Sequence, residues 1–321
     1  MTLSLTEEEI KGLNLDYVSS SRMTWVYIER PTQAEVDFLA HHFPQFHSLN
    51  LDDVLSRVQR PKIDEYEDHL FLVLHFPVFH KEARITSPSE VDIFVGEDYM
   101  VTIHCNGDLK PLSSFFKACQ TNEEMRHNYL EHSSGYLLYQ VLDRLVNYCF
   151  PILGKITENI DEVEGLTLAQ PTVETVRELS FIRRDLISFR RVIRPQLAVA
   201  ELLERGDYPL LRAEEEIYFG DIADHLRKIN DGLEDAREML DILYDTSNWL
   251  TSHRIQEIMR FLTIIMALLT PATVLASIYG MNIPLPGGVD KGSPLVLIAL
   301  LLIMFSVAAG LLYLFRRRGW L

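Results

Sequence analysis

Two long stretches without a charged side chain lie near the end of the chain and limit its possible folds most strongly. The first reads FLTIIMALLTPATVLASIY (261–279) and the second reads LVLIALLLIMFSVAAGLLYLF (295–315). About 20 apolar residues in a helix cross a hydrocarbon layer of about 30 Å. Long helices in the core of a soluble protein normally keep a polar face, which the second stretch lacks. The sequence therefore predicts two transmembrane helices, 258–279 and 295–315, joined by an outer loop, 280–294.

Positive charges flank this hairpin on one side of the membrane. Arg254 and Arg260 precede the first stretch, and Arg316, Arg317 and Arg318 follow the second. The loop between them holds one lysine beside one aspartate. Because basic flanks stay in the cytosol, we expect a multi-pass protein of the cell (inner or plasma) membrane with both termini in the cytosol.

The rest of the chain is acidic. The whole sequence has 46 acidic and 30 basic residues, a net charge of −16, although its tail is weakly basic. An acidic body disfavours nucleic-acid binding, which needs a positive face, and favours cations or simply solubility. The sequence has no GxxxxGK[ST] loop for ATP, and its 11 histidines include no HExxH spacing. We therefore expect no enzyme activity, no resident cofactor, and neither ATP nor nucleic acid as a partner.

The cytosolic part, 1–253, divides by pattern into three segments. Residues 1–110 read as an α/β sheet domain, with strand candidates TWVYIE, HLFLVLHFPVF, VDIFV and MVTIH. Thr32 and Glu35 form a capping-box pattern before a helix. Residues 111–211 read as long helices, chiefly 135–168 and 172–203, and residues 212–253 as a stalk helix.

The stalk carries an apolar seam at spacings of three and four residues. Its members are Phe219, Ile222, Leu226, Ile229, Leu233, Ala236, Leu240, Leu243 and Leu250, with Ser247 at the one polar position. No proline interrupts the helix before Pro271, so it can run into the first span as a rod of about 100 Å. Other helices or other chains must bury this seam, and we favour a symmetric oligomer.

The first span shows one polar stripe. Its members fall within a sector about 100° wide: Gln256, Met259, Leu262, Thr263, Met266, Thr270, Thr273 and Ser277. Small hydroxyl residues are common where membrane helices pack together. Polar rings separated by apolar constrictions are equally typical of a pore lining. Periodicity alone supports both interpretations about equally.

The span ends in Tyr279-Gly280-Met281-Asn282. Gly280 allows a sharp turn at the membrane surface, and Asn282 places an amide there. Because Mg²⁺ gives up its water reluctantly, a ring of neutral amide oxygens can select the hydrated ion. The alternative interpretation is an ordinary turn.

These residues together resemble the CorA family of magnesium channels, the 2-TM-GMN proteins. The similarity lies in LTIIMALLTPATVLASIYGMN, the second span, the terminal RRRGWL and the upstream segment VQRPKIDEYEDHLFLVL. The resemblance implies magnesium and cobalt transport through a funnel-shaped homopentamer, with one stalk helix per subunit continuing as the pore-lining span. Asn282, Gly280 and Met281 would form an outer ring for hydrated Mg²⁺. The family's pore lining corresponds here to Gln256, Met259, Leu262, Met266, Thr270, Thr273 and Ser277.

The resemblance also implies gating by intracellular Mg²⁺ bound between subunits, with Asp245 as the acidic stalk residue. Its partner on the neighbouring subunit corresponds to His80, where the family has an acid, with Glu82 close by. The family often has asparagine where this chain has Gln256. The 11 acidic residues between Glu214 and Asp245 read either as a solvated face or as weak Mg²⁺ contacts that hold the stalks together.

The predicted function is passive, membrane-potential-driven Mg²⁺ uptake. The alternative is a Zn²⁺ or Ni²⁺/Co²⁺ transporter of the same architecture, as in the ZntB branch. Met281 argues against that branch, which usually varies this position, whereas His80 leaves it open. A membrane-anchored scaffold without a pore would need neither the polar stripe nor the seam.

Overall fold

A computed structural model describes residues 9–56, 59–105, 109–169, 172–206, 208–211, 215–281 and 294–320 of the chain. Its contacts divide the chain into two compact units, Met1–Tyr244 and Asp245–Leu321. The division falls inside one continuous helix. The domain boundary expected at residues 253 and 254 stays a prediction.

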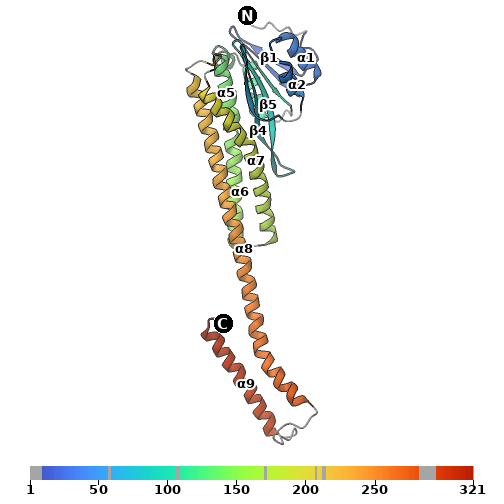
Figure 1. The fold of residues 1–321 in the computed structure, drawn as a ribbon, viewed down its shortest axis with the longest axis vertical. Helices are drawn as coiled ribbons and strands as arrows, with labels where there is room; N and C mark the ends of the chain where they lie inside the picture. Colours follow the sequence, from blue (N-terminus) through green and yellow to red (C-terminus); the bar gives the residue numbers. More distant parts are fainter. Residues whose placement is uncertain are drawn as a thin grey trace. The chain divides into compact units, whose positions relative to one another are not determined.

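A six-stranded sheet forms the N-terminal part of the first unit (Figure 1). The strands are β1 (Leu15–Ser19), β2 (Thr24–Glu29), β3 (Lys62–Glu65), β4 (His69–His80), β5 (Ile85–Gly96) and β6 (Tyr99–His104). They are arranged in the order β1-β2-β6-β5-β4-β3, and only the pairing of β2 with β6 is parallel. The four strand candidates of the sequence are confirmed, because each lies within β2, β4, β5 or β6.

Both faces of this sheet are covered. Along β4, Leu70, Leu72 and Leu74 belong to one apolar cluster, and Phe71 and Val73 belong to another. This alternation follows from the two-residue period of a strand. The helices α1 (Gln33–His42) and α2 (Ser48–Leu55) contribute to the second cluster, and all the later helices of this unit that enter a core join the first. The unit is therefore an α/β domain in three layers.

Local signals in the sequence set several helix ends. Thr32 and Glu35 form the expected capping box at α1. After α3 (Lys110–Thr121) and α4 (Glu123–Leu130), the helix expected over 135–168 is two helices, α5 (Ser134–Asn147) and α6 (Cys149–Ala169). The break precedes Pro151, whose ring lacks an N–H donor and clashes with the carbonyl four residues earlier. The next helix, α7 (Val173–Arg205), covers the helix expected over 172–203 and is capped by Gly206.

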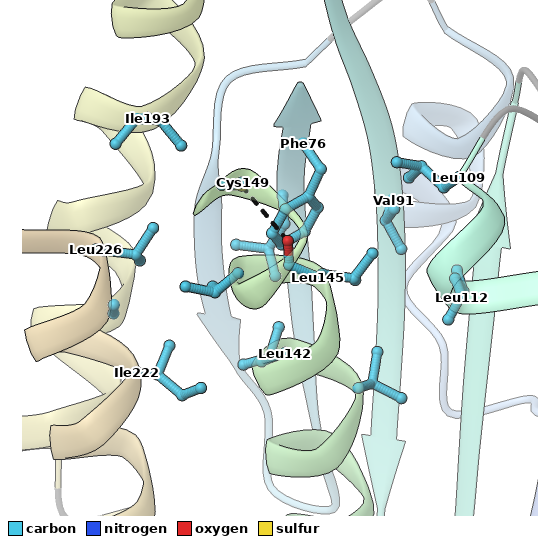
Figure 2. Close-up of a cluster of buried hydrophobic side chains, with 14 of the residues drawn as sticks. Phe76, Val91, Leu109, Leu112, Leu142, Leu145, Cys149, Ile193, Ile222 and Leu226 are labelled. Atoms are coloured by element: carbon cyan, nitrogen blue, oxygen red, sulfur yellow. Dashed lines mark hydrogen bonds between the residues drawn. The ribbon is translucent and has the colours of Figure 1, made fainter. Parts of the chain in front are cut away.

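The stalk is a single helix, α8 (Glu216–Gly280), of 65 residues. Its seam is buried from Phe219 to Leu243, and these residues share one core with side chains of α5, α6 and α7. Figure 2 shows Ile222 and Leu226 directed towards the cluster that holds Leu142 and Ile193. The helices of the same chain therefore bury the seam up to Leu243, so the seam does not require a second copy of the chain.

Ion pairs join the flank of α8 to α7. Arg190 pairs with Glu234, Arg227 with Glu204 at 2.7 Å, and Arg183 with Asp241 at 3.6 Å. Half-exposed pairs of this kind contribute little to stability, about 0–1 kcal/mol each. They show that some of the stalk acids are already paired with arginines of their own chain.

The second unit contains the rest of α8 and the helix α9 (Pro294–Arg317). Both helices contain a stretch long and apolar enough to span a membrane, and only 6% and 0% of the residues in these stretches are buried. The core helix of a soluble protein would be mostly buried. The two apolar helices therefore have the composition and the exposure of membrane spans.

Candidate functional site

The polar stripe of α8 lies on an open face of the second unit. All seven predicted pore-lining side chains are exposed in the single chain: Gln256, Met259, Leu262, Met266, Thr270, Thr273 and Ser277. Met266, at the middle of the stripe, is 60% exposed. The stripe is one continuous face because its members recur at helical spacing.

Another face of the same helix is partly shielded. Ile264 is only 6% exposed, and Ala267, Leu268, Ala272 and Leu275 are half-buried. The half-buried residues of α9 also share one face, spaced by three or four: Leu300, Met304, Ala308, Leu311 and Phe315. Within this unit the shielded side chains are thus apolar, and the stripe stays uncovered together with apolar residues such as Phe261 and Leu269.

The threonine hydroxyls on this side are oriented by their own helix. Thr263 donates to the Met259 carbonyl at 2.7 Å, Thr270 to the Met266 carbonyl at 2.7 Å, and Thr273 to the Leu269 carbonyl at 2.9 Å. A hydroxyl whose hydrogen is used in this way still has oxygen lone pairs to offer. The stripe therefore presents neutral acceptors, which suit a cation that retains its hydration shell.

The predicted outer ring lies at the end of α8. Gly280 is the last helical residue, and the Met281 N–H donates to the Ile278 carbonyl at 3.3 Å. The Met281 side chain is 48% exposed. Asn282 lies outside the described residues, so its place in the ring stays a prediction.

The predicted regulatory residues lie in two elements. His80 ends β4, where its Nε2 is 2.6 Å from the Ser87 hydroxyl, and Glu82 is exposed in the turn that follows. His80 and Glu82 thus share one hairpin of the first unit. Asp245 is an exposed residue of α8 and the first residue of the second unit. A metal site that joins these three residues across a subunit boundary stays a prediction.

The structure brings together a set of potential metal ligands that was missed at the sequence level. Ligand atoms of Asp143, Asp221 and His225 all lie within 4.8 Å of one another. The spacing of four residues between Asp221 and His225 was visible in the sequence, because such residues share a helix face. Asp143 comes from α5, and only the packing of that helix against α8 reveals its proximity.

Two buried acids were also missed. Glu90 and Asp92 lie on β5, 6% and 1% exposed, with His75 of β4 beside them. Burial, with the negative charge of Glu90 as a second cause, raises the pKa of Asp92 well above its usual range. The sequence signal for these buried acids was a strand of apolar residues interrupted by two acidic residues.

Comparisons with known proteins agree with this arrangement. Residues 20–317 match the family model described as CorA-like Mg²⁺ transporter protein. The cobalt/magnesium transport protein CorA of Thermotoga maritima is 30% identical over 96% of this chain and 86% of its own length. A putative metal ion transporter of Bacillus subtilis, YfjQ, is 29% identical over 100% of this chain and 98% of its own. The complete structure of the CorA magnesium transporter from Methanocaldococcus jannaschii superposes with a TM-score of 0.82 at 24% identity, covering 95% and 94% of the two chains.

The match spans the sheet from β2 onwards, the stalk helix and both apolar helices, which is nearly the whole chain. It includes the segment that carries the polar stripe and the Gly-Met-Asn ending of the first span. The fold, the two apolar helices and the family model lead to one assignment. The chain is a member of the CorA family of membrane transporters for divalent cations.

Proposed function

We propose that the chain is a passive Mg²⁺ channel that works as a homopentamer, with the stripe of α8 from each subunit lining the pore. The observation that carries the proposal is the division of α8 into faces. The shielded residues around Ile264 are apolar, whereas Thr270, Thr273 and Ser277 lie on the open side of the helix, which also carries exposed apolar residues. A polar face exposed to lipid is unfavourable. If the copies of α8 turned their stripes towards one common axis, the polar faces would line a water-filled passage instead.

The membrane potential supplies the driving force. A divalent cation that moves down about 100 mV gains about 4.6 kcal/mol, which suffices for uptake without ATP. Met259, Leu262 and Met266 would form apolar constrictions between the polar rings. The hydroxyl and amide oxygens would contact the hydrated ion without holding it tightly.

Flux measurements in vesicles identify the transported ion. Purified full-length protein in proteoliposomes should carry Mg²⁺ along an imposed membrane potential, and Asn282→Ala should abolish that flux. The matched control is Asn122→Ala, which removes an asparagine amide at the helix cap of α4 in the first unit. Unchanged flux in Asn282→Ala with an intact oligomer would refute the outer-ring role of Asn282 with Gly280 and Met281.

A second candidate is a Zn²⁺ or Ni²⁺/Co²⁺ transporter of the same architecture. The observation that favours it is His80, an imidazole in the position of a family acid, because imidazole suits these ions better than Mg²⁺. The same vesicles should therefore be tested with Zn²⁺, Co²⁺ and Ni²⁺ in parallel. Faster zinc entry that stops when a proton gradient is dissipated would establish this candidate and overturn Mg²⁺ conduction.

Intracellular Mg²⁺ would close the channel by binding between Asp245 of one subunit and the His80 and Glu82 hairpin of the next. Asp245→Ala should therefore leave flux less sensitive to internal Mg²⁺, because a ligand can shift a conformational equilibrium only through a state-dependent affinity. Asp52→Ala, an exposed acid on α2, serves as the control. Equal Mg²⁺ sensitivity in both variants would mean that Asp245 is an ordinary exposed acid.

We place both chain termini in the cytosol because the basic residues flank the hairpin on that side. A cysteine at Gly287, within the loop between the two helices, should then react with a membrane-impermeant thiol reagent added to intact cells. If this position is labelled only after lysis, the loop lies in the cytosol and both termini lie outside.

A further inference from the structure

The exposed face of α7 carries a stripe of positive charge on a protein whose net charge is −16. Arg177, Arg184 and Arg191 recur every seven residues, and all three side chains are exposed. Residues with this spacing share one face of a helix, and we call the three the arginine stripe. Within the part of the chain that the structure describes, Arg184 and Arg191 form no ion pair. The exposed Ile187 lies between these two and adds an apolar side chain to the stripe.

A stripe of opposite charge follows the exposed side of α8. Asp231 and Glu238 are exposed and also seven residues apart, and neither forms an ion pair with another described residue. Each lies two residues, or about 200° around the helix, from a seam residue that is at most 1% exposed, Leu233 or Leu240. This acidic stripe therefore points away from the core of its own chain and stays uncovered in the single chain.

The hairpin between β4 and β5 borders the arginine stripe on one side. Arg84 in its turn donates a hydrogen bond to Glu178 of α7 at 2.9 Å, and its guanidinium lies 4.9 Å from the centre of the Phe181 ring. Phe181 is about one helical turn from both Arg177 and Arg184. A segment of another subunit that reaches this hairpin therefore also reaches the arginine stripe.

The α8 helix of the same chain borders the stripe on its other side. Two ion pairs join the neighbouring arginines of α7 to this helix: Arg183 with Asp241 at 3.6 Å, and Arg190 with Glu234. The two pairs show that α7 and α8 run antiparallel, with one residue of α8 passed for each residue of α7. By this register, Arg184 lies level with Leu240, and Arg191 lies level with Leu233.

We propose that the arginine stripe of one subunit binds the acidic stripe of the next, with Arg184 facing Glu238 and Arg191 facing Asp231. This proposal rests on the homopentamer proposed above, in which Asp245 of one subunit reaches the hairpin of the next. Asp245 lies seven residues beyond Glu238, so it continues the acidic stripe along α8. An α8 helix that brings Asp245 to the neighbouring hairpin thus brings Glu238 and Asp231 to the arginine stripe beside that hairpin.

The heights of the two stripes match. Rotation about a symmetry axis leaves the height of every residue along that axis unchanged, so the α8 helix of the next subunit has the same register as the chain's own. Glu238 and Asp231 are each two residues from the positions level with Arg184 and Arg191, which is a difference of about 3 Å. Long side chains span such a difference. Both pairs form together because both stripes repeat every seven residues.

The contact gives the ring its order and register. Each subunit offers its arginine stripe to one neighbour and its acidic stripe to the other, which is the head-to-tail arrangement that closes a ring. Exposed ion pairs add little free energy and weaken as salt is added. Complementary charge instead selects the register, because a shifted α8 would separate the opposite charges.

Cross-linking between two differently tagged full-length chains tests the contact. Arg184→Cys in one chain and Glu238→Cys in the other are expressed together, and a short bis-maleimide is added to membrane fragments in EDTA. Arg191 and Asp231 stay unchanged in both chains. Tag-to-tag cross-links should form at least ~10-fold faster than with Arg184→Cys and Asp224→Cys, because thiols held close react at a high effective concentration. Asp224 is an exposed acid on the same side of α8, about 21 Å along the helix from Glu238.

Charge exchange is the second measurement. Arg184→Glu and Glu238→Arg should each lower the temperature at which the detergent-solubilised oligomer dissociates in EDTA, because each places like charges together. The double variant should recover, since it restores the pair with its charges exchanged. Lys117→Glu, a charge reversal at an exposed residue of α3, is the matched control and should behave as wild type.

The outcomes separate this interface from the channel. A conducting pentamer without the cross-link, or a double variant as unstable as the single ones, would overturn the interface and leave the channel proposal intact. A cross-linked ring that conducts no ion would support the interface and refute the channel, whereas a monomer would overturn both. Cross-linking that appears only when Mg²⁺ replaces EDTA would also overturn the interface, because the acids would then meet the neighbouring subunit through bound ions.

Discussion

At the scale of single residues, the first unit contains polar groups that its fold places where water cannot reach. Glu90 accepts the Gln59 backbone N–H at 2.6 Å and lies 3.1 Å from the His75 Nε2, yet its second oxygen has no partner among the described residues. Asp92 also has a buried oxygen without a partner in that part of the chain. Burial makes Asp92 hold its proton more tightly than it would in water, so its pKa is raised.

Asp92 should make stability depend on pH. Because its pKa is raised by burial, the folded protein binds this proton more tightly than the unfolded chain does. The stabilising contribution is complete below the ordinary carboxyl pKa of about 4 and is lost as the pH rises through the raised pKa. Asp92→Asn should therefore raise the melting temperature relative to wild type, by a margin that grows from acidic towards neutral pH.

The measurement is thermal unfolding at several pH values. Asp37→Asn, a change at an exposed acid of α1, is the control and should follow the wild type. A constant difference between Asp92→Asn and wild type across the pH range would show that Asp92 is not protonated preferentially in the folded state.

At the scale of the secondary-structure element, α8 combines two kinds of helix in one continuous run. From Phe219 to Leu243 its seam is buried in a core built by the same chain. Beyond Asp245 most of its side chains are exposed, and the apolar side that includes Ile264 is the shielded one. The same helical spacing thus places apolar side chains in the core of the first unit and a polar stripe on the exposed surface of the second.

Leu233→Ala tests the buried part of α8. Leu233 is fully buried, so we expect a loss of about 2–5 kcal/mol in the free energy of unfolding, from lost apolar burial and the cavity left behind. Ile217→Ala, at a residue of the same helix that is 78% exposed, should change it by less than about 0.5 kcal/mol. Chemical unfolding followed by circular dichroism measures both, and equal effects would contradict burial of the seam within the single chain.

At the scale of the whole molecule, the second unit leaves an exposed polar face that the single chain does not cover. Membrane helices bury such faces against other helices or around water. The pentamer we propose does both at once, because five stripes facing one axis enclose a wet passage. The native mass in detergent should therefore correspond to five chains, and any other number would refute the pentamer.

Cysteine cross-linking tests which face of α8 meets its copies. Thr273→Cys on the stripe should form disulfide-linked dimers under oxidation, whereas Ala272→Cys, one position away on the shielded face, should not. The two positions lie at nearly the same depth along the helix, so they differ mainly in direction. The native cysteines are half-buried (Cys105) or buried (Cys119 and Cys149), and the unsubstituted chain gives their background. Equal cross-linking of both variants would show that the stripe is not the face of α8 that meets its copies.

The sequence by itself determined the local features and the periodic ones. The two apolar helices, the strands, the capping box at Thr32 and the positions of the seam follow from hydrophobic period and local chemistry, which act between neighbours in the chain. The role of the stripe from Gln256 to Ser277 as a pore lining stays a prediction. The family assignment also followed from contiguous motifs.

Only the tertiary structure decided which partner each pattern meets. A seam has the same spacing whether its own chain or another copy buries it, and the structure shows that helices of the same chain do so up to Leu243. It also divided the predicted helix before Pro151 and set Asp143 beside Asp221 and His225. Residues so far apart in sequence meet only because a packed core fixes the rotation of each helix, and that rotation depends on the shapes of all the side chains in the core.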